Sequence, residues 1–181
     1  RLLLINKNMI NRLFDTNNYE FNSISNKGVY LLHGFSSTTY EVRELAEFLG
    51  SHGYHTVANN LPGHGTTVED CNKIKYDDWL YFVKEDIAKL ASTSDKIYVV
   101  GCSMGAVLTL YAASIFPLNA CVVGSTVLKF NNPFTINYLI PFLCKILKVQ
   151  NKDQHNDNAK YNTKYYGYDK YPLIALNEMR K

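Results

Sequence analysis

Short apolar runs alternate with helix-like repeats over the first two thirds of the chain. Residues 29–32 form a wholly apolar run of strand-forming residues, which is typical of a buried strand in a parallel sheet. Three further runs have the character of strands and occupy residues 54–58, 97–101 and 120–123. Strands at this spacing, with a helical pattern between them, predict βαβ units and a parallel sheet.

Amphipathic repeats fill the intervals between the strands. The first has apolar residues at i, i+3, i+4 and i+7, which predicts a helix with one face on the core, ended by Gly50 and Gly53. Its members are Val42, Leu45, Ala46 and Leu49. A second helix begins near Asp77, and its apolar stripe is Trp79, Val83, Ile87 and Leu90. Residues 104–115 are apolar almost all round, as in a buried helix. The fold class predicted is therefore α/β, with a mostly parallel sheet and helices on both faces.

The alternation stops after Lys129. Residues 134–149 are apolar but contain Pro141, which predicts two short helical pieces. This stretch is too short to span a membrane, and its two lysines would be unfavourable in lipid. We expect no membrane-spanning segment here.

The last part of the chain is polar and then helical. Residues 150–171 predict an irregular insertion without further strands, and Pro172 favours the start of a final helix that runs to about Arg180. We therefore divide the chain into a core, residues 1–129, and an insertion, residues 130–181.

Composition and charge narrow the class of protein. Apolar residues make up 46% of the chain and charged residues 19%, as in an ordinary soluble globular domain. The net charge of +3 is small and the basic residues are scattered, which argues against a nucleic-acid-binding protein. The cysteines form no CxxC pair, so we expect neither a disulfide framework nor a zinc site, and a cytoplasmic location fits best. They are Cys71, Cys102, Cys121 and Cys144.

The segment Gly101-Cys102-Ser103-Met104-Gly105 fits the pattern G-x-S-x-G. The pattern is specific here because it directly follows a predicted strand and directly precedes a predicted buried helix, where a nucleophile turn must lie. Its glycines permit the tight turn, and the helix N-terminus offers N–H donors to a developing oxyanion. Ser103 is therefore the candidate nucleophile.

A second candidate motif, His33-Gly34-Phe35, ends the first predicted strand. An oxyanion hole needs one N–H from the residue after the nucleophile and one from a loop after an earlier strand. The backbone amides of Met104 and Phe35 meet this description. His33 precedes Ser103, against the order Ser…Asp…His of such folds, so we interpret it as bracing the loop rather than moving protons.

The motifs HGF, LPGHG, DDW and GCSMG together resemble the carboxylesterase and monoacylglycerol lipase branch of the α/β-hydrolase superfamily. The similarity covers residues 29–127, and more loosely the rest. It implies Ser103 as nucleophile, the amides of Phe35 and Met104 as oxyanion hole, and a small cap from residue 130 onward that shapes an apolar acyl pocket. It also implies a small-molecule substrate, a carboxylic ester of short to medium acyl chain or a monoacylglycerol, cleaved through an acyl-serine with no cofactor or metal. Members usually read G-x-S-x-G-G, whereas this chain has Ala106 at the last position.

The resemblance places a catalytic Asp and His after further strands beyond the cap. We therefore expect the chain to be an N-terminal part that ends inside the cap, with the acid and base beyond residue 181. The acids and histidine that follow Ser103 are Asp153, His155, Asp157, Asp169 and Glu178. Asp153 and His155 have the right order, but a polar, Asn-rich stretch offers no rigid scaffold for a triad, so we interpret them as a solvated loop.

The remaining histidines, His52, His55 and His64, are expected to be loop and surface residues, because no acid or cysteine ligand set accompanies them. Two alternatives to ester hydrolysis stay open. One is thioester or C–C bond hydrolysis on the same fold, and the other is a binding module without acid and base. Without the final strands, one sheet edge should stay unpaired and expose apolar surface, which predicts a tendency to aggregate.

Overall fold

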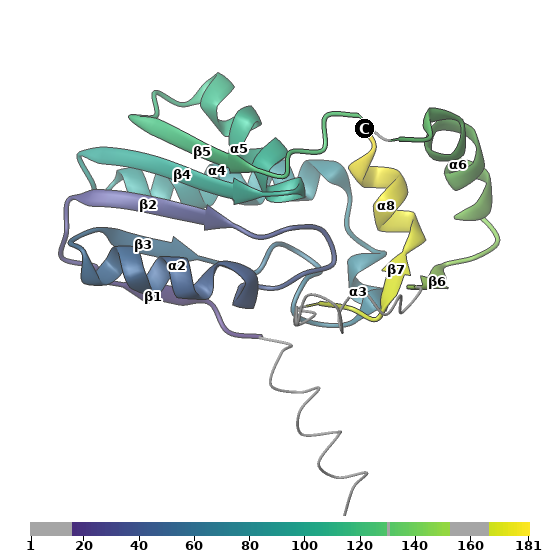
Figure 1. The fold of residues 1–181 in the computed structure, drawn as a ribbon, viewed down its shortest axis with the longest axis horizontal. Helices are drawn as coiled ribbons and strands as arrows, with labels where there is room; N and C mark the ends of the chain where they lie inside the picture. Colours follow the sequence, from purple (N-terminus) through teal and green to yellow (C-terminus); the bar gives the residue numbers. More distant parts are fainter. Residues whose placement is uncertain (1–15, 130, 153–166) are drawn as a thin grey trace, which may run out of the picture.

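A five-stranded sheet forms the centre of the computed structural model, which describes residues 16–129, 131–152 and 167–181 (Figure 1). Its strands are β1 (Tyr19–Phe21), β2 (Lys27–Leu32), β3 (His55–Ala58), β4 (Lys96–Cys102) and β5 (Ala120–Gly124). Their order is β1-β3-β2-β4-β5; β2 to β5 are parallel, and β1 pairs antiparallel with β3. The four predicted strands are confirmed. The sequence missed β1, because three residues are too few for a periodic pattern.

Helices cover both faces of this sheet, as expected (Figure 1). They are α2 (Tyr40–Ser51), the short α3 (Val68–Cys71), α4 (Tyr76–Ala91) and α5 (Met104–Ile115). Successive side chains of β2 point to opposite faces. Val29 and Leu31 pack in the cluster that includes residues of α2, whereas Tyr30 and Leu32 pack with residues of α4 and α5.

The apolar stripe predicted on α4 is buried in full, as expected. On α2 the prediction was partly wrong, because Leu45 is 41% exposed and Gly50 belongs to the helix. A Cβ atom at Gly50 would lie 2.5 Å from the Cβ of Phe21, so this glycine lets β1 approach the helix closely. The chain leaves the helix at Gly53, whose φ of +88° suits glycine.

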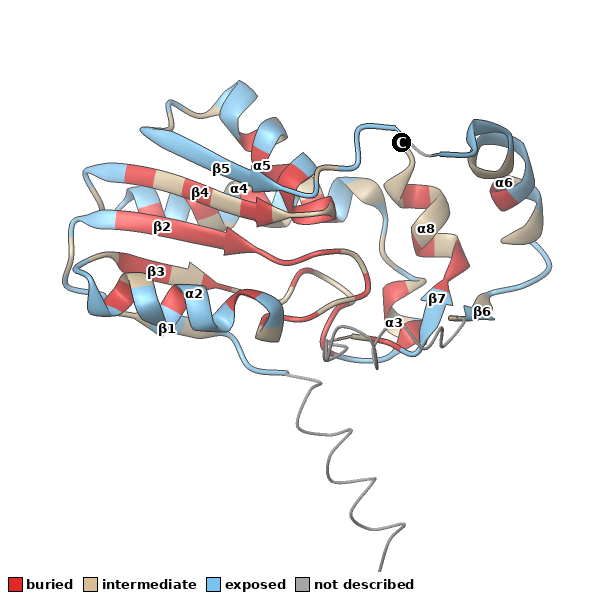
Figure 2. Cartoon of the chain, in the orientation of Figure 1, coloured by how far each residue is buried: buried red, intermediate tan, exposed pale blue. Residues whose placement is uncertain are grey.

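One edge of the sheet is β5, and all five of its residues are exposed (Figure 2). Val122 in particular is 62% exposed. The sequence predicted that the helix over residues 104–115, α5, is buried on all sides. This prediction was wrong for one part of the helix surface. The large apolar side chains of α5 that are exposed are Val107, Leu110 and Ile115.

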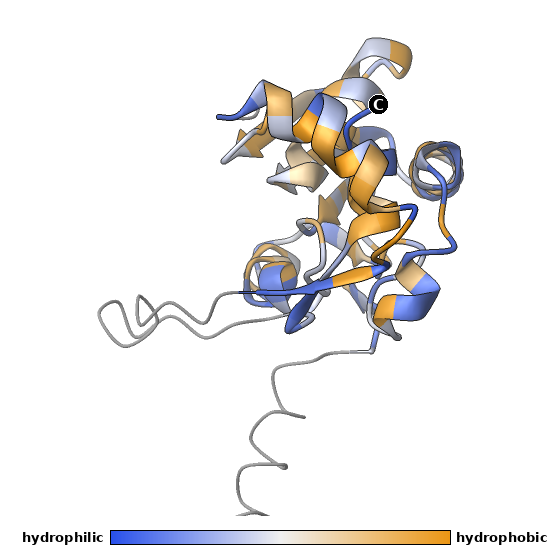
Figure 3. Cartoon of the chain, turned by 90° about the vertical axis from the view of Figure 1, so that its right-hand side faces the viewer, coloured by the Kyte–Doolittle hydropathy of each residue, from blue (hydrophilic) through white to orange (hydrophobic). Residues whose placement is uncertain are grey.

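The C-terminal segment begins with η1 (Thr135–Leu139), a π-helical turn that runs directly into α6 (Ile140–Leu143), and ends in α8 (Leu173–Met179). Between these helices, β6 (Val149–Asn151) pairs antiparallel with β7 (Lys170–Pro172). The expectation of no further strands was therefore wrong, because both strands are too short to show a pattern. A hydrophilic β7 leads into the apolar first turn of α8 (Figure 3). Among the described residues no helix has the length and hydropathy to cross a membrane.

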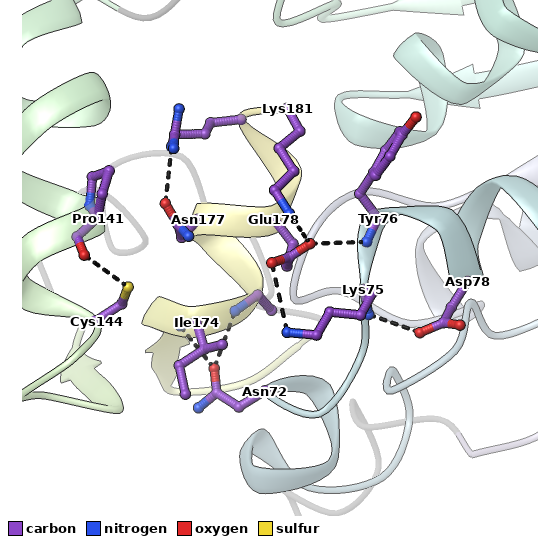
Figure 4. A network of polar contacts seen from close by, with 12 residues as sticks. Asn72, Lys75, Tyr76, Asp78, Pro141, Cys144, Ile174, Asn177, Glu178 and Lys181 are labelled. Atoms are coloured by element: carbon purple, nitrogen blue, oxygen red, sulfur yellow. Dashed lines mark hydrogen bonds and ion pairs between the residues drawn. The ribbon is translucent and has the colours of Figure 1, made fainter.

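Polar contacts fix α8 to the segment that precedes α4 (Figure 4). The side-chain oxygen of Asn72 accepts hydrogen bonds from the backbone amides of Ile174 (3.0 Å) and Ala175 (3.2 Å). Amides in the first turn of a helix have no acceptor within the helix, and Asn72 supplies one here. Glu178 is only 5% exposed, and its carboxylate accepts hydrogen bonds from the Tyr76 amide and the Lys181 ammonium. A buried carboxylate is tolerated when it is paired in this way, so these contacts define the position of α8.

Candidate active site

Ser103 lies on the turn between β4 and α5, at the N-cap of α5. Its φ of 54° and ψ of −115° are uncommon for a residue with a side chain, and such a conformation persists only where the surroundings impose it. The backbone N–H of Ser103 donates to the carbonyl of Gly124 (2.9 Å), and its carbonyl accepts from the amide of Ala106 (3.1 Å). Both neighbouring elements, β5 and α5, therefore hold this turn.

Two glycines make the turn sterically feasible. A Cβ at Gly101 would lie 2.2 Å from the carbonyl oxygen of Gly105, and a Cβ at Gly105 would lie 2.3 Å from the carbonyl oxygen of Leu32. Both obstacles are backbone atoms, which cannot move aside without displacing β2 or α5. The close packing of strand, turn and helix therefore requires glycine at both positions.

The loop after β2 comes directly beside the Ser103 turn. A Cβ at Gly34 would lie 3.2 Å from the Cβ of Ser103, and Gly34, Phe35 and Ser103 line one cavity of about 420 Å³. In the described part of the chain, neither the amide of Phe35 nor that of Met104 donates to a protein acceptor. Phe35 lines the cavity of Ser103, whereas Met104 lines a different, apolar cavity.

His33 braces this loop, as the sequence predicted. Its Nδ1 bonds the carbonyl of Gly34 (2.8 Å), and its Nε2 accepts a hydrogen bond from the amide of Leu61 (3.0 Å). The ring is fully buried, and burial lowers its pKa to about 3. With both nitrogens occupied and the ring neutral, His33 is unsuited to accept the proton of Ser103.

The other described histidines differ in their environment. His64 was expected at the surface, but it is buried against Phe35 and Trp79, and its Nε2 accepts from the amide of Ser36 (3.0 Å). His55 is also buried, contrary to expectation, and bonds Glu20 (2.7 Å), whereas His52 is exposed. No three metal-ligating side chains cluster anywhere among the described residues.

Acid should destabilise the fold through His33 and His64. Burial lowers the pKa of His64 to about 4 and that of His33 to about 3, whereas both rings gain protons near pH 6.5 in the unfolded chain. Between these values the unfolded state binds more protons, so the free energy of unfolding falls as the pH falls below about 6.5. We expect urea unfolding to show this loss already between about pH 6.5 and pH 5, above the range of ordinary carboxylates. A free energy of unfolding that does not change between pH 6.5 and pH 5 would contradict this prediction. So would a His64→Gln variant whose free energy of unfolding depends on pH as steeply as that of the parent.

Two residues that the sequence did not single out also line the Ser103 cavity. The carboxylate of Glu41 accepts a hydrogen bond from the amide of Gly34 (2.6 Å), and the ammonium of Lys152 donates to the hydroxyl of Ser36 (2.7 Å). Burial lowers the pKa of Lys152 to about 8. Glu41 lies only a few residues after the HGF motif, so the sequence could have suggested it as a site residue. Lys152 is distant from both motifs in the sequence, and no sequence pattern marks it.

A second, apolar cavity of about 440 Å³ adjoins this one. Met179 of α8 lines both cavities, and Met104 lines the apolar one. Other apolar residues around it include Trp79, Leu80, Leu108, Val127 and Leu128. The cavity at Ser103 also has the polar side chains of Ser36, Glu41 and Lys152 in its lining, and it meets the apolar cavity at Met179 of α8.

The acids and the histidine that follow Ser103 give no acid–base pair in the described structure. Asp153, His155 and Asp157 lie outside the described residues. Glu178 is engaged in fixing α8, and the backbone carbonyl of Asp169 accepts from the amide of Lys152 (3.1 Å).

Known proteins share the motifs and the architecture. Residues 28–143 match the family model for the alpha/beta hydrolase fold. A thermostable monoacylglycerol lipase from Bacillus sp. (strain H-257) is 40% identical over 102 residues, which are 52% of this chain and 41% of the lipase. A carboxylesterase from Bacillus subtilis (strain 168) is 33% identical over 97 residues, 53% of this chain and 39% of that protein. The matches thus span about two fifths of each of these relatives.

Solved structures agree on the fold. The structure described for LipS and LipT, two metagenome-derived lipolytic enzymes, aligns with a TM-score of 0.80 at 23% identity, over 91% of this chain and 66% of that one. A monoacylglycerol lipase from Paleococcus ferrophilus aligns with a TM-score of 0.67 at 18% identity, over 91% and 68% of the two chains. Because the family model also spans more than half of the sequence, this chain belongs to the α/β hydrolase fold family.

Proposed function

We propose that the whole protein containing this chain is a serine hydrolase that cleaves carboxylic esters, with Ser103 as its nucleophile. One observation carries the proposal. Ser103 stands on a left-handed turn at the N-terminus of α5 and shares a cavity with Phe35, whose amide has no acceptor among the described residues. The names of the two Bacillus relatives, a monoacylglycerol lipase and a carboxylesterase, support ester chemistry.

In this mechanism the hydroxyl oxygen of Ser103 attacks the ester carbonyl while a histidine outside the described residues takes its proton. The carbonyl oxygen becomes an oxyanion, and the amides of Phe35 and Met104 donate hydrogen bonds to it. The alcohol leaves with the proton that the histidine returns. Water then attacks the acyl-serine by the same route and releases the acid. Preorganised N–H donors of this kind lower the barrier because they need no reorientation as charge develops.

The two cavities suggest how an ester is divided between them. The apolar cavity next to Met104 suits the acyl chain, and the cavity at Ser103, which Ser37 and Glu41 also line, suits the alcohol. Glu178, Arg180 and Lys181 also line this apolar cavity, so its apolar part is smaller than the whole volume and favours short to medium chains. A monoacylglycerol, with its small polar alcohol, fits the same division.

The test is a chain-length series on the whole protein. We expect it to hydrolyse p-nitrophenyl butyrate and octanoate, and the palmitate ester at least about 10-fold more slowly in kcat/KM, because the long chain would reach the charged part of the cavity lining. Faster turnover of a butyryl thioester than of the matched oxygen ester would replace ester hydrolysis by thioester hydrolysis. Binding of butyrate esters without any turnover would indicate a binding module.

A further inference from the structure

Ser36 connects the candidate oxyanion loop to the C-terminal segment. It directly follows Phe35 and has a φ of 58°, an uncommon conformation for serine. Each of its polar groups is bonded. Its amide donates to His64 (3.0 Å), its carbonyl accepts from the amide of Tyr168 (2.9 Å), and its hydroxyl accepts from the ammonium of Lys152 (2.7 Å). Two of these three partners flank β6 and β7.

The approach of this segment to Ser36 is close along the backbone as well. A Cβ at Gly167 would lie 1.7 Å from the carbonyl oxygen of Ser36, so only glycine allows the chain to pass there. The next residue, Tyr168, is buried, and its hydroxyl donates to the carbonyl of Gly63 (2.7 Å). The segment therefore lies against both loops that surround Phe35.

Lys152 is the charged member of this contact. Its ammonium lies 4.7 Å from the centre of the Tyr171 ring and lines the same cavity as Ser103. Removing an ammonium from water is unfavourable, and the lowered pKa of Lys152 is the signature of that desolvation. A neutral side chain would fill the same space without this desolvation penalty. We therefore expect the ammonium of Lys152 to have a function.

We propose that the pair of strands β6 and β7 clamps the candidate oxyanion loop, and that Lys152 is the positioning residue through which it does so. The hydrogen bond to the Ser36 hydroxyl holds Ser36 in its left-handed conformation. The preceding amide, that of Phe35, is thereby held toward the cavity of Ser103. The inference rests on the proposed function, because it gives the C-terminal segment a part in assembling the oxyanion hole.

The first test compares Lys152→Met with Lys145→Met in the whole protein, using p-nitrophenyl butyrate. Lys145 is exposed and lies outside both cavities, so its variant controls for the loss of one positive charge. We expect Lys152→Met to lower kcat about 10- to 100-fold with KM changed by less than about 3-fold, since a loosened donor weakens transition-state stabilisation rather than binding. Lys152→Arg should recover part of the rate because arginine can still donate to Ser36.

A double-mutant cycle decides whether the effect runs through Ser36. The variant Ser36→Ala should resemble Lys152→Met, and the double variant should be no slower than either single one. Additive losses would overturn the clamp, as would a raised KM with unchanged kcat, which would make Lys152 a substrate contact. Rates equal to those of Lys145→Met would also overturn it.

Amide hydrogen exchange gives a readout that does not depend on catalysis. The amide of Ser36 should exchange faster in Lys152→Met than in the parent and in Lys145→Met, because the loop is released. Unchanged exchange would contradict the clamp even if activity fell. If the parent hydrolyses no ester, the proposed function fails, whereas faster exchange in Lys152→Met would still support the clamp.

Discussion

Replacing Ser103 by alanine is expected to lower kcat for p-nitrophenyl butyrate by about 10⁴- to 10⁶-fold in the whole protein, because no acyl-enzyme can then form. The thermal midpoint should stay close to that of the parent, since Ser103 is held by its backbone and alanine keeps the same turn.

The matched control for this variant is Ser114→Ala. Ser114 is exposed on the same helix, α5, and its hydroxyl bonds only the backbone carbonyl of Tyr111 within the described structure. We expect it to retain parental kcat. If the Ser103→Ala protein keeps more than about 1% of the parental rate, another group attacks the ester carbonyl.

Replacing Gly105 by alanine is expected to lower the free energy of unfolding by about 3 kcal/mol or more. The added Cβ would lie 2.3 Å from the carbonyl oxygen of Leu32 and 2.7 Å from that of His33, so α5 would have to move away from β2. The same shift would displace the Ser103 turn and remove activity. Urea unfolding followed by circular dichroism measures the stability change.

Gly124→Ala is the control for Gly105→Ala. Among the residues that the structure describes, a Cβ at Gly124 meets no atom within 4 Å, and Gly124 also lies at the end of a strand beside the turn. Its substitution should change the free energy of unfolding by less than about 1 kcal/mol. If both alanine variants unfold at the same urea concentration, the close packing of β2 against α5 does not govern stability.

The main sheet could be predicted because buried parallel strands are continuous apolar runs. The runs at β2, β4 and β5 are each followed or preceded by a helical repeat, and this alternation leaves few other arrangements. By contrast, β1, β6 and β7 are three residues long each and owe their existence to a partner strand distant in sequence. No local pattern marks such strands.

The candidate site was predictable where backbone geometry imposes residue types. The spacing of Gly101, Ser103 and Gly105 reflects a turn that only glycines permit, and the HGF loop follows a predicted strand end. Lys152 and the burial of His64 were not predictable, because both depend on how distant segments pack onto one loop. The residues expected to react could therefore be predicted from the sequence. The residues that hold them in position could be identified only from the structure.

The role of Ser103 as nucleophile is tested most directly by covalent labelling of the whole protein with a fluorophosphonate, a reagent that traps activated serine nucleophiles, followed by peptide mass spectrometry. We expect one adduct per molecule, on the peptide that carries Ser103, and none in Ser103→Ala. Ester hydrolysis that continues while Ser103 stays unlabelled, or labelling at another serine with loss of activity, would contradict it.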